Sequence, residues 1–107
     1  MDILERLYQV VLDRKANPRN DSYVCSLLQQ GEDGILKKLG EEAVEAILAA
    51  KAGDDDAIVH ELADLVFHTV VLLGARGIDP NRIGRELERR FGQSGMKEKA
   101  SRDPSLY

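Results

Sequence analysis

The sequence predicts an all-α fold, a bundle of about four to five helices in one domain. Two observations indicate it. Apolar residues recur at helical spacing as far as about residue 91, and no run alternates with the period of two that marks a strand for longer than three or four residues. In addition, only 5% of the residues are aromatic, which is typical of helices packed through Leu, Ile, Val and Ala.

Capping and turn residues set the expected helix boundaries. Asp2, with Glu5 three residues later, caps a first helix, and Ser22 caps a short second helix that Gly31 stops. Gly53 ends a long third helix. The acidic run at 54–56 suits the start of the fourth helix, which Gly77 closes. The expected helices cover about residues 3–15, 23–30, 33–52, 55–75 and 80–91.

Two of these helices carry apolar stripes. The stripe of the third helix consists of Ile35, Leu36, Leu39, Ala43, Ala46, Ile47 and Ala50. The last helix, which begins at Pro80, has a narrower stripe of Ile83, Leu87 and Phe91. After Gly92 the periodicity disappears, so residues 1–92 are expected to form the all-α domain and residues 93–107 its polar C-terminal tail. A chain of 107 residues buries a modest core, so a homodimer is expected to complete the bundle.

Composition and charge exclude several classes of protein. The net charge of -4 disfavours nonspecific nucleic-acid binding. The single cysteine, Cys25, forms no intrachain disulfide and, with two histidines, no closed zinc site. The N-terminus carries acids where a secretory signal needs positive charge, and the run from Val70 to Leu73 is too short to span a bilayer. We therefore expect a cytoplasmic protein with no membrane partner.

The third helix carries three neighbouring acids, Glu41, Glu42 and Glu45. At 100° per residue, Glu42 falls at the edge of the apolar stripe, with Glu45 next to it. Alone, this group is a weak signal, because Glu is a good helix former and a solvated acidic face is the more common explanation.

The acids of the fourth helix are harder to explain as surface residues. Between positions 61 and 75 every residue is apolar or small except Glu61, Asp64, His68 and Thr69, and the first three of these share one face. A helix apolar nearly all round is expected to be buried. Burying a carboxylate costs several kcal/mol unless it is paired or binds a metal.

Antiparallel packing of these two helices brings Glu42 and Glu45 opposite Glu61 and Asp64. Four carboxylates in one pocket need cations, and all-oxygen ligation favours Mg²⁺, with Mn²⁺ as a possible substitute. Such a site suits hydrolysis of a triphosphate. A di-iron site is the rival, but it usually requires Glu-x-x-His pairs, which His68 does not supply.

Two further residues have open alternatives. Lys38 lies one turn before Glu42, where it can either reach a phosphate oxygen or pair with Glu42. His68 can either contact a substrate at the rim of the site or be a hydrogen-bonded core residue.

The spacing of the acids resembles the signature of the all-α, MazG-like nucleotide pyrophosphohydrolases. Three segments more specifically resemble the phosphoribosyl-ATP pyrophosphatase family of histidine biosynthesis: Ser22-Tyr23, residues 37–43 (KKLGEEA) and residues 61–68 (ELADLVFH). The tail, with Ser94-Gly95 and then residues 98–102 (EKASR), is similar to the ending of many members. The resemblance covers about residues 3–102.

The resemblance implies hydrolysis of 1-(5-phosphoribosyl)-ATP to the AMP derivative and pyrophosphate, in a dimer of MazG-like helical bundles. It implies that Glu41 is a supporting acid or the base that orients water. It also implies two sets of binding residues: the metal ligands Glu42, Glu45, Glu61 and Asp64, and the phosphate contacts Lys38, Lys99 and Arg102.

The sequence departs from the family pattern at two positions. Val24 replaces a usual Thr and Phe67 a frequent Tyr, so each removes a hydroxyl and neither is expected to be catalytic. Two other functions remain open. One is a MazG-like housekeeping enzyme that hydrolyses noncanonical nucleoside triphosphates, and the other is a non-catalytic helical dimerisation module.

Overall fold

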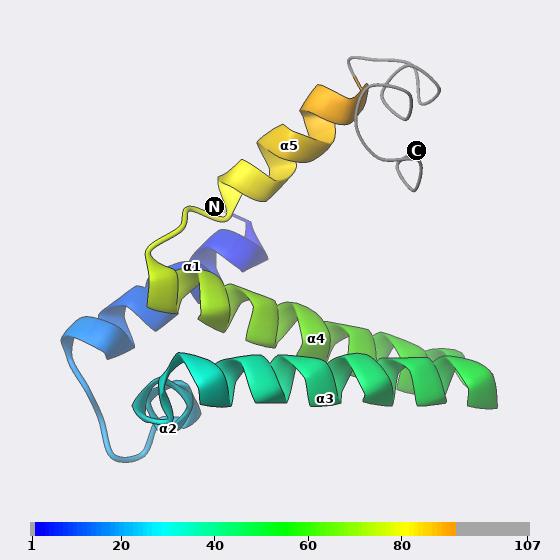
Figure 1. The fold of residues 1–107 in the computed structure, drawn as a ribbon, viewed down its shortest axis with the longest axis horizontal. Helices are drawn as coiled ribbons and strands as arrows, with labels where there is room; N and C mark the ends of the chain where they lie inside the picture. The colour runs from blue at the N-terminus through cyan, green and yellow to red at the C-terminus, as the bar shows by residue number, and fades with distance from the viewer. Residues whose placement is uncertain (1, 92–107) are drawn as a thin grey trace.

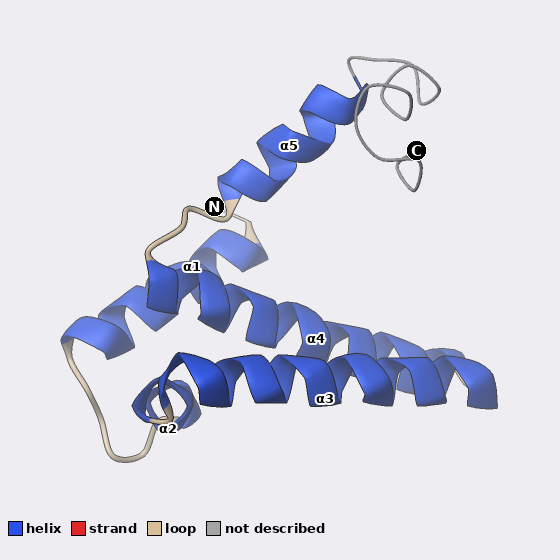
Figure 2. Cartoon of the chain, viewed as in Figure 1, coloured by secondary structure: helices blue, strands red, loops and turns tan. Residues whose placement is uncertain are grey.

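The computed structural model describes residues 2–91, and within them the chain is all α-helical, as predicted (Figure 2). The predicted tail and the predicted phosphate contacts Lys99 and Arg102 lie outside the described residues. The helices are α1 (Ile3–Ala16), α2 (Tyr23–Gln29), α3 (Gly31–Ala52), α4 (Asp55–Arg76) and α5 (Asn81–Phe91).

The helix ends lie within two residues of the expected ones, and the predicted caps of α1 and α2 form, whereas α3 begins at Gly31 without a side-chain cap. Asp2 Oδ1 accepts a hydrogen bond from the Glu5 backbone N–H at 2.8 Å, and Ser22 Oγ accepts one from the backbone of Cys25 at 3.2 Å. Gly53 ends α3 in the left-handed conformation with φ of 86°. The helix boundaries were therefore predictable from local chemistry.

Helices α3 and α4 lie side by side and antiparallel, and they are the longest elements of the fold (Figure 1). Helix α1 packs against α4, and α2 closes one end of the pair by contacting α1, α3 and α4. The core gathers at that end and consists of Tyr8, Val11, Val24, Leu27, Ile35, Val70, Val71 and Leu73. Helix α5 projects away from the bundle and buries none of its residues, including the predicted stripe (Figure 1).

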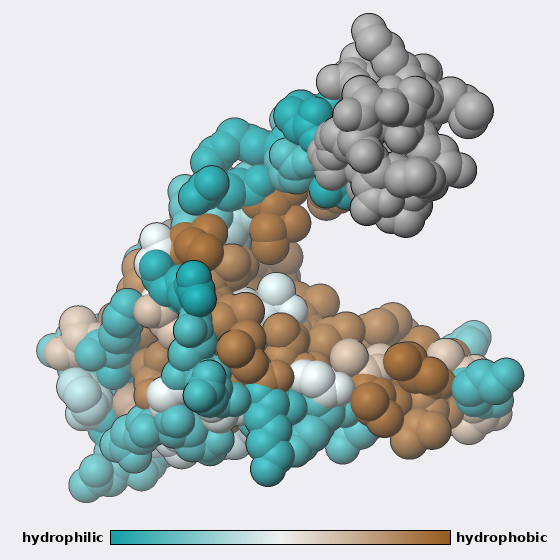
Figure 3. Space-filling model, viewed as in Figure 1, coloured by the Kyte–Doolittle hydropathy of each residue, from teal (hydrophilic) through white to brown (hydrophobic). Residues whose placement is uncertain are grey.

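The expectation that α4 is buried all round is wrong for the single chain. Val59 is 66% exposed and Leu62 46%, and on α3 the stripe residue Ile47 is 61% exposed. The reason is that the core gathers at one end of the α3–α4 pair, and at Val59 and Leu62 the start of α1 lines an apolar groove with these side chains without covering them. Figure 3 shows this apolar surface extending along both helices.

Helix α4 is also the one described helix that is long and apolar enough to cross a membrane. The core helix of a soluble bundle meets the same criterion. Because α4 packs along α3 and carries Glu61 and Asp64, we interpret it as a core helix of the bundle.

Candidate metal and nucleotide site

The antiparallel α3–α4 pair brings the predicted acids together. Gly53 reverses the chain, and Asp54 Oδ1 accepts a hydrogen bond from the backbone of Asp56 at 3.3 Å, so α4 begins immediately after α3 ends. One carboxylate oxygen from each of Glu42, Glu45 and Glu61 lies within 4.8 Å of the others. These three residues form what we call the inner cluster.

The inner cluster contains carboxylate oxygens that nothing else satisfies. Glu42 is only 6% exposed, as its place at the edge of the apolar stripe predicted. Its Oε2 atom and the Oε2 atom of Glu61 are buried without a hydrogen-bond partner in the described part of the chain. Most buried polar atoms in folded proteins have a partner, so two orphans in one cluster indicate a place for a cation.

The pKa values of the cluster agree with this interpretation. Burial raises the pKa of Glu42 above its ordinary value, and the neighbouring Glu45 raises it further. Burial likewise raises the pKa of Glu61, with Glu45 again adding to the effect. A divalent cation would stabilise the ionised form of both carboxyls, so metal binding and proton release are coupled here.

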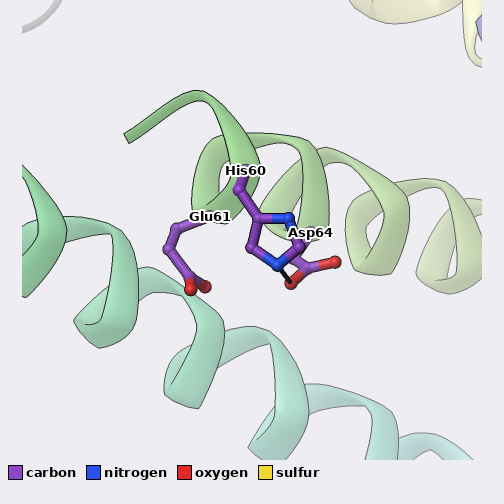
Figure 4. Close-up of side chains that lie close together, drawn as sticks. All are labelled: His60, Glu61 and Asp64. Carbon is purple, nitrogen blue, oxygen red and sulfur yellow. Dashed lines mark ion pairs between the residues drawn. The ribbon is translucent and has the colours of Figure 1, made fainter. Parts of the chain in front are cut away.

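Asp64 belongs to a second group, which overlaps the first. Ligand atoms of His60, Glu61 and Asp64 lie within 4.8 Å of one another, and we call these residues the outer group (Figure 4). The four predicted metal ligands are thus divided between the inner cluster and the outer group, and Glu61 belongs to both. Sequence reasoning missed His60, although its position four residues before Asp64 on one helix was the available signal.

Lys38 and Glu41 lie at the edge of the inner cluster. The Lys38 Nζ atom lies 3.7 Å from Glu41 Oε2 and 3.7 Å from Glu42 Oε1, so the ion pair considered from the sequence is present. The Lys38 side chain is still 33% exposed, which leaves its amine accessible to an anion from solvent. The Glu41 side chain is 47% exposed and belongs to neither metal-ligand set.

His68 is buried and engaged on both ring nitrogens. Its Nδ1 atom lies 2.7 Å from the Asp64 carbonyl oxygen, which only accepts, so Nδ1 carries the proton. Its Nε2 atom then accepts the hydroxyl proton of Tyr23 at 3.4 Å. With 3% exposure, His68 fits the hydrogen-bonded core alternative, and its direct contact with substrate stays a prediction.

A cavity of about 300 Å³ connects the acids to aromatic side chains. Tyr23, Phe67 and His68 line it together with Glu42 and Asp64. The Tyr23 and Phe67 rings are stacked, with centroids 5.9 Å apart. An aromatic wall next to carboxylates provides one surface for a base or sugar and another for metal-bound phosphates.

The two departures from the family pattern have different structural meanings. Val24 is 7% exposed and belongs to the core, whereas Phe67 lines the cavity. The hydroxyl that is missing at position 67 therefore affects the surface of the candidate site, and the one missing at position 24 does not line it.

This all-α fold, with carboxylates clustered beside an aromatic cavity, fits the all-α nucleotide pyrophosphohydrolases, a class of hydrolases that act on phosphoric anhydride bonds. The family model described as phosphoribosyl-ATP pyrophosphohydrolase matches residues 4–91. The chain belongs to this family, which confirms the resemblance and the assignment as a hydrolase.

Relatives that carry the family's name align along nearly the whole chain. The phosphoribosyl-ATP pyrophosphatase of Geotalea daltonii is 57% identical over 102 residues, which are 95% of this chain and 96% of the relative. That of Geobacter metallireducens is 57% identical over 94% of this chain and 93% of its own length. That of Methylococcus capsulatus is 52% identical over 95% and 97%.

Proposed function

We propose that this protein hydrolyses 1-(5-phosphoribosyl)-ATP to 1-(5-phosphoribosyl)-AMP and pyrophosphate, the second step of histidine biosynthesis, in the cytoplasm. The observation that carries the proposal is the pair of buried, unpartnered oxygens of Glu42 and Glu61 in the inner cluster, since Glu42 also lines the aromatic cavity. The relatives named for this substrate support its identity, since they are up to 57% identical to the chain.

We propose Mg²⁺ as the cofactor, with Mn²⁺ as a possible substitute, because the inner cluster offers only oxygen ligands. The residues that would hold it are Glu42, Glu45, Glu61 and Asp64. A bound ion supplies charge neutralisation of the triphosphate and a lowered pKa for a bound water. In the net reaction, water adds to a phosphorus, the anhydride bond between the α and β phosphates breaks, and pyrophosphate leaves.

The remaining side chains bind and orient. The accessible amine of Lys38 faces the edge of the inner cluster, where it would contact a phosphate oxygen. Glu41, which lies beside Lys38 at the edge of the inner cluster, would accept a proton from the attacking water. His68 holds the Tyr23 hydroxyl and so fixes the ring that forms the aromatic wall.

A homodimer is part of the proposal, because the single chain leaves a large apolar face uncovered. Exposed apolar side chains follow α3 and α4: Val44, Ile47, Leu48, Val59 and Leu62, of which the last two line an apolar groove with the start of α1. Charging this face by Ile47→Asp should convert a dimer to monomers in analytical ultracentrifugation. The control is Asp33→Asn, which changes an exposed residue of α3 and should leave the dimer intact. A monomeric unmodified chain would contradict the homodimer.

The substrate is tested by offering the purified chain phosphoribosyl-ATP and a panel of noncanonical nucleoside triphosphates, with Mg²⁺. We expect the highest kcat/KM for phosphoribosyl-ATP, and no turnover by Asp64→Asn. Faster hydrolysis of a free triphosphate would replace this proposal with the housekeeping function. No hydrolysis at all, with a melting temperature that does not respond to Mg²⁺, would favour the dimerisation module.

A further inference from the structure

The start of α1 and the first half of α4 form an apolar groove of about 480 Å³. Ile3, Leu4 and Leu7 line it from α1, and Val59, Leu62 and Val66 line it from α4. Ile3 is 67% exposed and Val59 66%, so the groove is open to solvent. An exposed apolar groove of this kind marks a contact with another molecule.

Helix α5 carries a second exposed apolar surface, its stripe of Ile83, Leu87 and Phe91. Leu87 is 44% exposed and Phe91 82%, and among the described helices α5 packs closely on none. A space of about 390 Å³ separates the stripe from the bundle, with Leu87 on one side and Leu4 on the other. Figure 3 shows hydrophobic surface on both sides of the angle between α5 and the bundle.

The connection between α4 and α5 holds α5 away from the groove of its own chain. Gly77 ends α4 in the left-handed conformation with φ of 69°, and the Ile78 backbone N–H donates to the Leu73 carbonyl at 2.9 Å. The Ile78 side chain packs against the core, and the Asp79 carboxylate caps α5 by accepting from the Asn81 backbone at 2.9 Å. Hydrogen bonds and packing therefore set the direction of α5.

We propose that the α5 helix of a second copy docks in this groove, and that two copies exchange these helices across a twofold axis. The exchange fills the groove and covers the stripe of both copies at once, because a twofold interface uses the same surfaces on each copy. The lengths agree, since positions 83–91 on α5 and 59–67 on α4 each extend about 12 Å. Val59 and Leu62 also belong to the apolar face of the proposed homodimer, so this inference rests on that part of the proposed function and identifies the helix that contacts it.

Charge also favours a second copy as the occupant. Helix α5 carries four arginines and two glutamates, so it is basic in a chain whose net charge is -4. Acids flank the groove, with Glu5 on α1 and Asp55 and Asp56 one turn before Val59 on α4. The arginines of a docked α5 would meet these acids. The same acids disfavour an anionic membrane, the other partner that suits a basic amphipathic helix.

Phe67 connects the groove to the candidate site. It lines the groove and also the aromatic cavity, where its ring stacks on Tyr23. A helix in the groove therefore packs behind the aromatic wall, and the second copy completes the wall against which a nucleotide would bind.

Photo-cross-linking tests the docking without nucleotide or turnover. The full chain carries benzoylphenylalanine in place of Leu87, and unlabelled and ¹⁵N-labelled copies are equilibrated as mixed dimers before irradiation. We expect mass spectrometry to find mixed-isotope cross-links from position 87 to residues 3–7 and 59–67. The matched control carries the same probe in place of Arg85, on the opposite face of α5, and should not give these cross-links.

A substitution in the stripe provides a second measurement. Leu87→Asp should raise the dissociation constant of the dimer at least tenfold in sedimentation equilibrium, whereas Glu88→Gln, at an exposed position of the same helix, should leave it unchanged. Because α5 buries none of its residues, both variants should keep their fold, which circular dichroism verifies. A fluorinated phenylalanine at position 67 should give a ¹⁹F signal that shifts when Leu87→Asp separates the copies, and an unchanged signal would overturn the docking.

Other occupants of the groove give different results. Cross-links confined to one copy would mean that α5 closes onto its own groove, and a monomeric chain that binds phosphatidylglycerol vesicles would make the stripe a membrane contact; either result overturns the inference. A dimer without cross-links to the groove would overturn it too, while the homodimer of the proposed function would stand. Because no nucleotide is present, these outcomes are independent of whether phosphoribosyl-ATP is the substrate.

Discussion

Glu42 offers the sharpest test of the site, because replacing it should stabilise the metal-free protein while abolishing its response to metal. The side chain is 6% exposed, one oxygen has no partner, and Lys38 approaches the other only to 3.7 Å. Glu42→Gln keeps the shape of the side chain and removes the charge. We therefore expect a higher melting temperature for the metal-free variant at pH 7.

The magnitude follows from the buried oxygen. A buried acceptor without a partner costs about 1–3 kcal/mol, and the loss of the distant Lys38 pair offsets part of the gain. A net change of ~1 kcal/mol corresponds to a rise of about 4–8 °C in the melting temperature of a chain of this size.

The difference should also depend on pH in a defined direction. Because burial and Glu45 raise the pKa of Glu42 above 4.5, the folded state binds the proton more tightly than the unfolded state. The destabilisation by the ionised carboxyl is therefore absent below about pH 4.5, grows as the pH rises through the raised pKa and is complete above it. The variant and the unmodified chain should melt together at pH 4 and separate toward pH 7.

The assay is differential scanning calorimetry of chelator-treated protein between pH 4 and pH 8, repeated with Mg²⁺. Mg²⁺ should raise the melting temperature of the unmodified chain and leave Glu42→Gln unchanged. The matched control is Glu41→Gln, which makes the same chemical change one residue away on an exposed side chain. The metal-free melting temperature of this variant should stay within about 2 °C of that of the unmodified chain. A Glu42→Gln variant that is less stable at pH 7, or that still responds to Mg²⁺, would refute the reasoning.

Two other substitutions test the packing and the phosphate contact. A Cβ at Gly74 would collide with the fully buried Val11, so Gly74→Ala should lower the free energy of unfolding in urea by about 1–3 kcal/mol. Gly40 has open space around it, so the control Gly40→Ala should raise the free energy of unfolding by up to ~1 kcal/mol. Equal effects of the two substitutions would contradict the close packing of α1 on α4. In steady-state assays of pyrophosphate release, Lys38→Met should lower kcat/KM for the nucleotide about tenfold. The control Lys37→Met changes an exposed lysine and should leave kcat/KM unchanged. Equal kcat/KM values for the two variants would remove Lys38 from the site.

The sequence determined the helix ends well, because those ends depend on local groups. Asp2 and Ser22 cap α1 and α2 through their own side chains, and Gly53 adopts the left-handed conformation that closes α3. The inward position of Glu42 was likewise predictable, since its angle on the helix relative to the apolar stripe is a property of α3 alone.

Other features depend on contacts that periodicity does not contain. Ile35 and Ile47 lie on the same predicted stripe, yet Ile35 is 1% exposed and Ile47 61%, because Ile35 packs in the core with Leu27 of α2, the one described element besides α4 that contacts α3. The hydrogen bond between Tyr23 and His68 joins residues 45 positions apart. His60 lies just before the apolar part of α4, which begins at Glu61, so no apolar neighbourhood distinguishes it in the sequence from a surface residue.

Helix α4 shows why a chain of this size would need both a cation and a second copy. One side of it presents Glu61 to the inner cluster, and another side exposes Val59 and Leu62 to solvent. The unneutralised carboxylates and the uncovered apolar surface can be tested separately, because the first depends on the metal concentration and the second on the protein concentration. We expect stabilisation by metal to scale with free Mg²⁺ and to be lost in Glu42→Gln, and stabilisation by dimerisation to scale with protein concentration and to be lost in Ile47→Asp. If the two variants proved additive in melting temperature, the charged and apolar sides of the α3–α4 pair would act independently.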